Sequence, residues 1–150
     1  MLQVGDKAPE FDLMSDSGTQ VRLRDLKGKT VVLYFYPKDD TPGCTKEACA
    51  FRDDYAAFSK KSVILGVSLD DTKSHQKFKQ KYALPFPLLS DEGARVSKAY
   101  GVYKKKSMYG RTFWGVERST FVIGPEGKLQ ALFPRVKVDG HSLEVMEAIS

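Results

Sequence analysis

The two cysteines of this 150-residue chain, Cys44 and Cys49, lie only five positions apart. A cysteine thiolate is a nucleophile and can be oxidised reversibly. Just before Cys44, Thr41 is a residue type that caps helices, and Pro42 suits the first helical position. We therefore expect a helix from Pro42, with the Thr41 hydroxyl accepting a hydrogen bond from a backbone amide. Cys44 would then lie third in the helix, where free amides and the helix dipole favour a thiolate.

An apolar strand is expected directly before this turn. Val31–Tyr36 is a run of β-branched and aromatic residues, typical of a strand that is covered on both faces. Pro37 ends the strand because proline cannot donate to the ladder, and the polar residues after it form a turn. Gly43 lets another group approach the start of the helix closely. This arrangement favours a reactive Cys44 over the alternative, a small buried apolar residue.

The spacing of the cysteines restricts how they can react with each other. Five residues of an α-helix rise about 7.5 Å and turn about 140°, which places their Cα atoms about 8.7 Å apart. A disulfide spans at most about 7 Å between Cα atoms, so Cys44 and Cys49 cannot pair within a regular helix. They can pair only if the first turns unwind, which would give a folded reduced form and a locally unfolded oxidised form. The alternative is two unrelated thiols in a reducing compartment.

The string Pro37-x-x-x-Thr41-x-x-Cys44 resembles the active-site motif of the peroxiredoxins. The additional Cys49 is similar to the Q subfamily, also called bacterioferritin comigratory proteins, in which many members carry a resolving cysteine five residues after the peroxidatic one. The resemblance therefore implies that Cys44 is the peroxidatic cysteine and that Cys49 resolves it.

The similarity extends from VGDKAPEFDL at residues 4–13 to GVERSTFVIGPEGK at residues 115–128, and so covers nearly the whole chain. It implies one thioredoxin-like domain over residues 1–150. The residue patterns agree, because alternating strand and helix signals predict an α/β fold with a mixed central sheet, helices on both faces and an N-terminal β-hairpin. We expect strands at 11–14, 21–23, 31–36, 62–70, 88–90, 119–123 and 129–133, helices at 41–59, 72–82, 93–100 and 142–150, and a long loop at 104–115.

Three further residues gain a role from the resemblance. Arg118 matches the arginine that lies against the peroxidatic sulfur, although an arbitrary arginine here would simply pair with Glu117 or another carboxylate. A permanent cation favours the thiolate, and its several donors can hold a peroxide oxygen. Pro37 is expected to shield the pocket from water. Glu47 is expected either to orient Arg118 or to be an ordinary solvated helix carboxylate. The predicted substrate-binding residues are Thr41, Gly43, Cys44 and Arg118.

The function implied by the resemblance is thiol-dependent reduction of hydrogen peroxide and organic hydroperoxides. Cys44 would become a sulfenic acid and then form an intramolecular disulfide with Cys49, which thioredoxin would reduce. A monomer is the expected state, although dimers occur in the subfamily. Two alternatives remain. A disulfide oxidoreductase of the thioredoxin type shares the fold but normally has C-x-x-C, and a DNA-associated or chaperone-like protein is favoured only by the charge.

The composition limits the other classes of function. The chain has 24 Lys and Arg against 19 Asp and Glu, with a net charge of +5 and a pI near 9.1. Its basic residues are dispersed apart from Lys77 and Lys81 on one helical face and the run Lys104–Lys106, so we expect no specific nucleic-acid site. No apolar run approaches the roughly 20 residues of a membrane helix.

Cofactors and location are constrained by the same residue types. We expect no metal and no cofactor, because C-x4-C is an unusual zinc pairing and His75 and His141 are both expected on the surface. Two cysteines fit a reducing cytosol, and the N-terminus lacks the features of a signal peptide. A cytoplasmic protein is therefore expected, with prior removal of a transit peptide left open.

Overall fold

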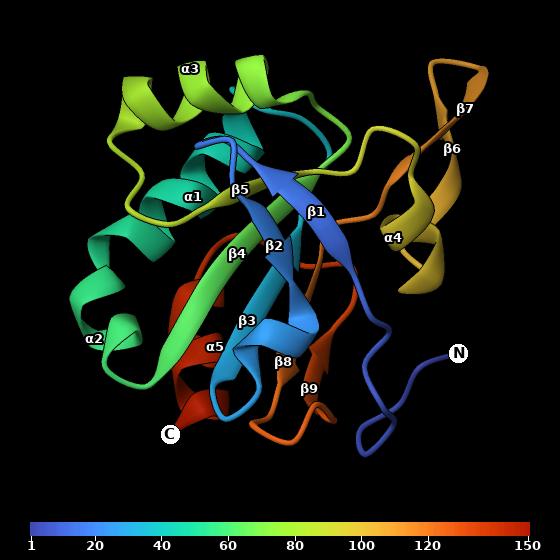
Figure 1. Ribbon diagram of the computed structural model, residues 1–150. Coiled ribbons are helices and arrows are strands. Elements are labelled where there is room, and N and C mark those ends of the chain that lie inside the picture. Colours follow the sequence, from blue (N-terminus) through green and yellow to red (C-terminus); the bar gives the residue numbers. More distant parts are fainter.

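The computed structural model describes residues 1–150. Its centre is a mixed seven-stranded sheet with the order β2-β1-β5-β4-β3-β8-β9 (Figure 1). β3 (Thr30–Phe35) is flanked by β4 (Ser62–Ser68) in parallel and by β8 (Ser119–Ile123) in antiparallel orientation. The other elements are β1 (Asp12–Ser15), β2 (Gln20–Arg22), the 3-10 helix η1 (Leu23–Leu26), α1 (Pro42–Asp53), α2 (Tyr55–Ser59), α3 (Thr72–Tyr82), β5 (Leu88–Ser90), α4 (Arg95–Ala99), β6 (Tyr103–Met108), β7 (Arg111–Val116), β9 (Leu129–Phe133) and α5 (His141–Ile149).

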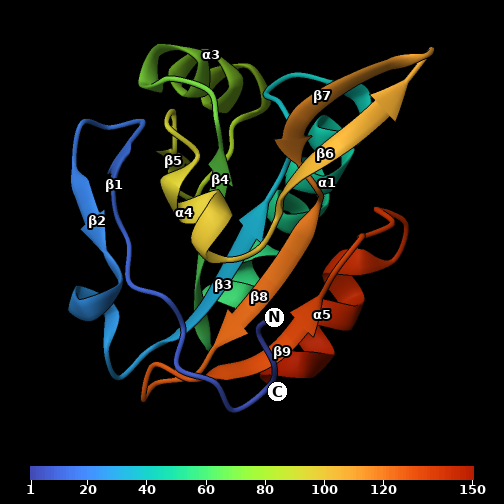
Figure 2. The same cartoon turned by 90° about the vertical axis from the view of Figure 1, so that its right-hand side faces the viewer.

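Each face of the sheet is covered by its own apolar cluster, because side chains alternate along a strand. On one face, Tyr34 of β3 packs in the same cluster as Phe51 of α1, together with residues of α3 and α5. On the other face, Phe35 belongs to a cluster that includes Val96 of α4. Figure 2, turned by 90° from Figure 1, shows α4 and α5 on either side of the sheet. The predicted α/β fold with helices on both faces is therefore confirmed.

Most of the predicted elements are present, including the N-terminal hairpin of β1 and β2. α3, β5, β8 and β9 have the predicted bounds. The single helix predicted over residues 41–59 is wrong, because the chain leaves helical geometry at Asp54, with φ −98° and ψ 8°. The Asp54 carboxylate accepts a hydrogen bond from the Ser142 hydroxyl of α5 at 2.9 Å, so this break between α1 and α2 is attached to a distant part of the chain.

The loop predicted over residues 104–115 is wrong as well. The segment forms a separate two-stranded hairpin, β6–β7, which extends away from the main sheet (Figure 2). Its turn has positive φ at Tyr109 (54°) and Gly110 (75°), the conformation that tight hairpins require at both central residues. Tyr103 and Trp114 stack across the strands with ring centroids 5.6 Å apart. The exposed apolar residues of the hairpin are Met108, Tyr109, Phe113 and Trp114.

Gly66 allows β4 to pack closely against its neighbours. A Cβ at this position would lie 2.9 Å from the Cζ and hydroxyl of Tyr34 and 3.0 Å from Leu88 Cδ2, all in a buried region. We therefore expect Gly66→Ala to lower the free energy of unfolding by roughly 1–3 kcal/mol, measured by urea denaturation. Gly93→Ala is the control, because nothing lies within 4 Å of a Cβ there. Equal stability of the two variants would contradict this explanation.

Candidate active site

Cys44 lies where the sequence predicted, third in α1, and is 2% exposed. The first hydrogen bond of the helix runs from the Thr45 amide to the Thr41 carbonyl, at 2.8 Å. The amides of Gly43 and Cys44 precede this bond and therefore take no part in the helical ladder. The sulfur of Cys44 thus lies in the first turn of the helix, next to amides that can donate to an anionic group.

Arg118 is brought to this helix start by the sheet. β8 is antiparallel to β3, and the pair Ser119–Phe35 places the start of β8 beside the end of β3. Arg118 directly precedes β8, so its side chain reaches the helix that follows β3. Its Nη2 donates to Cys44 Sγ at 3.4 Å, and its Nη1 donates to Glu47 Oε1 at 2.7 Å. One guanidinium therefore joins the thiol and a buried carboxylate.

Gly43 leaves room for this guanidinium. A Cβ on Gly43 would lie 3.0 Å from Nη2 and 3.8 Å from Cζ of Arg118. The close approach that the sequence predicted at Gly43 is therefore made by a side chain of the protein itself. A side chain at position 43 would have to displace the arginine that contacts Cys44.

Glu47 is buried rather than solvated, with 1% of its surface exposed. Burial raises the pKa of Glu47 to about 7, and the charge and hydrogen bond of Arg118 only partly oppose this. Its second oxygen, Oε2, has no hydrogen-bond partner, and neither does the buried hydroxyl of Tyr34. Burial, together with the nearby Glu47 and Cys44, also raises the pKa of Tyr34 well above its usual value.

The raised pKa of Glu47 predicts how stability depends on pH. Because the folded-state pKa of about 7 exceeds the usual 4.5, the folded protein retains a proton that the unfolded chain releases, and stability falls as pH rises between these values. We expect Glu47→Gln to reduce the loss of unfolding free energy between pH 5 and pH 8 by roughly 1–3 kcal/mol, measured by urea denaturation. The exposed Glu147→Gln is the control. An unchanged pH dependence in Glu47→Gln would contradict the shift.

Thr41 does not cap the helix through its side chain, so that prediction is wrong. Its hydroxyl instead donates to the Lys38 carbonyl at 2.8 Å, because the turn after Pro37 brings that carbonyl within reach. The hydrogen of the hydroxyl is thereby used, and the oxygen remains free to accept. Thr41 and Pro37 are both half-buried in the turn that precedes Cys44.

Lys106 also belongs to this neighbourhood, which the sequence did not indicate. Lys106 is partly buried, whereas Lys104 and Lys105 are exposed. Its Nζ donates to the Val116 carbonyl. Burial and the charge of Arg118 lower the pKa of Lys106, while Glu117 and Cys44 oppose this shift. The basic run is therefore not a uniformly solvated surface.

Cys49 is partly exposed and lies in the same unbroken helix as Cys44. Both thiols are free. This agrees with the expectation that two cysteines five positions apart in an intact helix are too distant to form a disulfide. The local unfolding that a disulfide would need, between about Thr41 and Asp54, stays a prediction.

Both histidines are buried, so the prediction of surface positions is wrong. His75 is 0% and His141 1% exposed, and each ring nitrogen has a partner. His141 lies between Thr120 at 2.7 Å and Glu144 at 2.6 Å, and burial lowers its pKa. Partners from distant parts of the chain compensate the burial of these polar rings.

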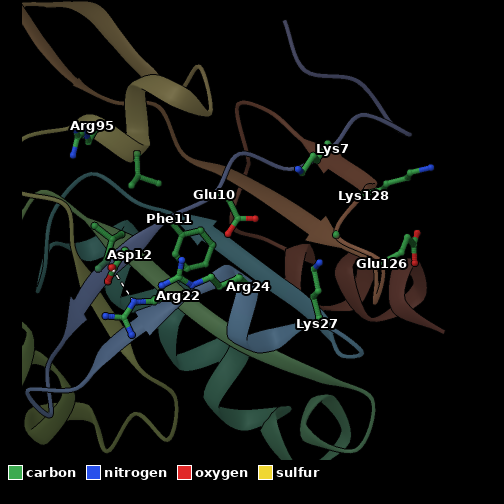
Figure 3. A pocket seen from close by; sticks show the side chains of 13 residues that line it. Lys7, Glu10, Phe11, Asp12, Arg22, Arg24, Lys27, Arg95, Glu126 and Lys128 are labelled. Atoms are coloured by element: carbon green, nitrogen blue, oxygen red, sulfur yellow. Dashed lines mark hydrogen bonds and ion pairs between the residues drawn. The ribbon is translucent and has the colours of Figure 1, made fainter.

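A hollow of about 690 Å³ is lined by 13 residues, and Cys44 is not one of them. Figure 3 shows this hollow from close by. Figure 3 shows Glu10 and Phe11 in its middle with the side chains of Lys7 and Lys27 around them. Lys27 precedes β3, whereas Cys44 follows the end of that strand, so the hollow lies toward the opposite end of the sheet. No cysteine lines the hollow, and the chemistry of the cysteines therefore belongs to the start of α1.

Residues 4–132 match the AhpC/TSA family. The chain belongs to this family. It is 56% identical over 146 residues to a putative peroxiredoxin Bcp of Coxiella burnetii, with 97% of each chain covered. It is 47% identical to peroxiredoxin Bcp of Bacillus subtilis, with 99% of this chain and 95% of the relative covered.

Solved structures give the same assignment. The bacterioferritin comigratory protein of Xanthomonas campestris, described for its alkyl peroxide reduction activity, superposes with a TM-score of 0.90 at 41% identity, covering 99% of this chain and 96% of that one. A cysteine-to-serine variant of peroxiredoxin Q from Xylella fastidiosa superposes with a TM-score of 0.92 at 39% identity, covering 98% of this chain and 94% of that one. The protein is thus a peroxiredoxin of the Bcp/Q type with a thioredoxin-like fold, and its activity is that of a thiol-dependent peroxidase.

None of the helices combines the length and the apolar character needed to cross a membrane.

Proposed function

We propose that the protein reduces hydrogen peroxide and organic hydroperoxides with Cys44 as the attacking thiolate. The observation that carries this proposal is the Arg118 guanidinium, 3.4 Å from the Cys44 sulfur and 2.7 Å from Glu47. A permanent cation beside a sulfur at a helix N-terminus favours the thiolate, which is the reactive form. In this proposal Glu47 holds Arg118 in position, and Gly43 provides the space.

In the first step, the Cys44 thiolate attacks the terminal oxygen of the hydroperoxide. A sulfur–oxygen bond forms, the oxygen–oxygen bond breaks, and the leaving oxygen takes a proton and departs as water or an alcohol. Negative charge grows on that oxygen, and Arg118 and the free amides of Gly43 and Cys44 can stabilise it. Thr41 acts as an acceptor for the hydroperoxide O–H, because its own hydrogen is bound to Lys38. Pro37 excludes water from the turn side.

In the second step, Cys49 resolves the sulfenic acid on Cys44. The Cys49 thiolate attacks the oxidised sulfur, a disulfide forms, and the sulfur–oxygen bond breaks to release hydroxide, which takes a proton to become water. The start of α1 must unwind first, because the intact helix separates the two residues. A dithiol reductant of the thioredoxin type then reduces the disulfide by thiol exchange.

The proposal also concerns the class of substrate and several properties of the whole protein. Organic hydroperoxides are included because the similar Xanthomonas protein is described as reducing alkyl peroxides. A single domain, a monomeric state, a cytoplasmic location and the absence of a specific nucleic-acid partner stay predictions, and sedimentation and cell fractionation would test the state and the location.

The experiment that tests the proposal mixes the reduced protein with one equivalent of hydrogen peroxide and follows oxidation by rapid quench and intact mass. We expect rapid loss of the mass of two hydrogens from each chain, as a Cys44–Cys49 disulfide requires. Oxidation no faster than that of a free thiol such as glutathione would overturn the proposal.

A further inference from the structure

A buried polar network lies beneath the turn that leads to Cys44. We call residues Pro37–Thr41, between β3 and α1, the catalytic loop. Its middle residue, Asp39, is 8% exposed. The Asp39 carboxylate accepts hydrogen bonds from the hydroxyls of Tyr36 at 2.6 Å and Ser74 at 2.8 Å, and Oδ2 lies 2.7 Å from His75 Nδ1. The loop is thus attached through Asp39 to the interior.

The partners of His75 fix how many protons this network holds. His75 Nε2 lies 2.9 Å from the Leu89 carbonyl, which can only accept, so Nε2 carries a hydrogen. Nδ1 faces Asp39 Oδ2, and a hydrogen bond there needs one more proton, carried by either the imidazole or the carboxyl group. With that proton the pair has no net charge. Without it, a buried lone pair faces a buried carboxylate oxygen, which is unfavourable.

The catalytic loop needs such an attachment because its backbone is strained. Asp40 has φ 56°, a left-handed conformation that glycine adopts freely and aspartate only occasionally. Its carboxylate is held only by exposed contacts to Lys81 and Tyr82 of α3, each at 2.9 Å. Exposed ion pairs contribute little, so the buried contacts of the neighbouring Asp39 are the stronger restraint.

We propose that Asp39 and His75 are positioning residues whose shared proton anchors the catalytic loop to α3 and β5, and that this anchor holds Pro37 and Thr41 in place for the reaction of Cys44. The inference rests on the proposed role of Cys44. It assigns a role to a histidine that contacts neither cysteine and lies 31 positions after Cys44 in the chain.

The same residues could be considered as a metal site, since ligand atoms of Asp39, Asp70 and His75 lie within 4.8 Å of one another. These atoms are already used in hydrogen bonds. Asp70 Oδ2 accepts from the Ser68 hydroxyl at 2.6 Å and from the Asp39 amide at 2.8 Å. A cation would have to replace these donors, so the contacts support an anchor rather than a metal site.

The anchor should weaken at alkaline pH. Burial of the ring lowers the pKa of His75, but the hydrogen bond and charge of Asp39, with smaller contributions from the Leu89 carbonyl and Asp70, raise it above 6.5 overall. The titratable groups that face His75 are Asp39, Asp70 and the hydroxyl of Tyr36, 3.4 Å away. The stabilising proton is therefore retained to higher pH than on a free imidazole and is lost as pH rises through the folded-state pKa.

An asparagine at position 39 distinguishes the effect of the hydrogen-bonded anchor from the effect of its titrating proton. In Asp39→Asn the NH2 group takes the place of Oδ2 and can donate to Nδ1 of a neutral His75 and to the Ser74 hydroxyl oxygen, while the amide oxygen still accepts from Tyr36. Asp39→Asn therefore keeps the anchor without the titrating proton, whereas Asp39→Ala removes the anchor itself. Asp71→Ala is the matched control, because it removes only the N-cap of α3, the 2.8 Å bond from the Ser74 amide.

The test measures the rate constant for Cys44 oxidation by hydrogen peroxide in a Cys49→Ser background, from neutral to alkaline pH. We expect Asp39→Ala to be oxidised about 10- to 100-fold more slowly than the parent, because small displacements of a reacting group are costly, and Asp71→Ala to be oxidised at the parent rate.

The pH profile tests the proton of the anchor. The parent rate should fall at alkaline pH, and Asp39→Asn should largely remove this fall. A decline caused by Lys106, whose pKa is lowered, would persist in Asp39→Asn.

Two results would overturn the inference. One is an Asp39→Ala protein that is oxidised as fast as the parent, and the other is an Asp39→Asn protein with the parent's alkaline decline. Slow oxidation of the parent itself would instead overturn the proposed role of Cys44. If Asp39→Ala fails to fold, Asp39→Asn alone decides. The nitrogen NMR chemical shifts of the His75 ring in the reduced protein provide a readout without peroxide, and loss of the proton at or below the pH at which a free imidazole loses it would contradict the shared proton.

Discussion

Cys44→Ser is expected to abolish peroxide reduction, lowering the rate by roughly four orders of magnitude or more, because a serine hydroxyl is a weak nucleophile without an activating base. The fold should survive, since the replaced atom is small and a hydroxyl can still accept from Arg118 in place of the sulfur. The measurement is consumption of peroxide by the variant with a thioredoxin system present, with circular dichroism to verify folding.

Cys49→Ser is the matched control for this experiment, because it removes the second thiol of the same helix and leaves the contacts of Cys44 intact. We expect Cys44 to be oxidised at the parent rate in this variant, while turnover linked to thioredoxin is lost. Peroxide consumption by Cys44→Ser at the parent rate would contradict the assignment of the nucleophile. Normal turnover by Cys49→Ser would show that the resolving thiol lies elsewhere, for example on a small-molecule donor.

The same two variants distinguish the alternatives left open by the sequence. A disulfide oxidoreductase of the thioredoxin type should reduce insulin and should lose this activity in both variants. A DNA-associated protein should be insensitive to Cys44→Ser and sensitive to substitutions in the basic run. Only Lys104 and Lys105 of that run are fully exposed, because Lys106 is partly buried.

The start of α1 could be predicted from the sequence because its signals are local. A buried apolar run, a proline that ends it, and the Thr-Pro-Gly segment are all contained within residues 31–43. The approach of Arg118 to Cys44 is different in kind. It depends on the pairing of β8 with β3, strands that are far apart in the sequence, and the resemblance to a family, not the pattern of residues, indicated it.

The errors of the sequence analysis have a common physical origin. The lysine-rich helix predicts a surface position for His75, but Asp39 and Leu89 provide partners for both ring nitrogens. The residue type predicts that the hydroxyl of Thr41 accepts from an amide, but it donates to a carbonyl in its own turn instead. In each case the outcome depends on where polar partners are placed by the folded chain, which residue types alone do not reveal.

Arg118 provides the second large effect. Arg118→Met is expected to lower the rate constant for Cys44 oxidation by about 100- to 1000-fold, the usual loss when one donor to a developing negative charge is removed. The reason is geometric as well as electrostatic, because the guanidinium contacts Cys44 with one nitrogen and is held by Glu47 through the other. Rapid-quench oxidation in the Cys49→Ser background measures this step separately from resolution and recycling.

Arg118→Lys separates the charge of the side chain from its geometry. An ammonium group is a single point of charge and cannot contact Cys44 and Glu47 with two fixed nitrogens. We therefore expect lysine to recover only part of the loss, with a rate constant still about tenfold or more below that of arginine. Arg111→Met, on the exposed hairpin, is the control for removing a positive charge from the surface and should be oxidised at the parent rate. Full recovery by lysine would mean that charge alone activates the sulfur, and the buried carboxylate of Glu47 would then have no part in the first step.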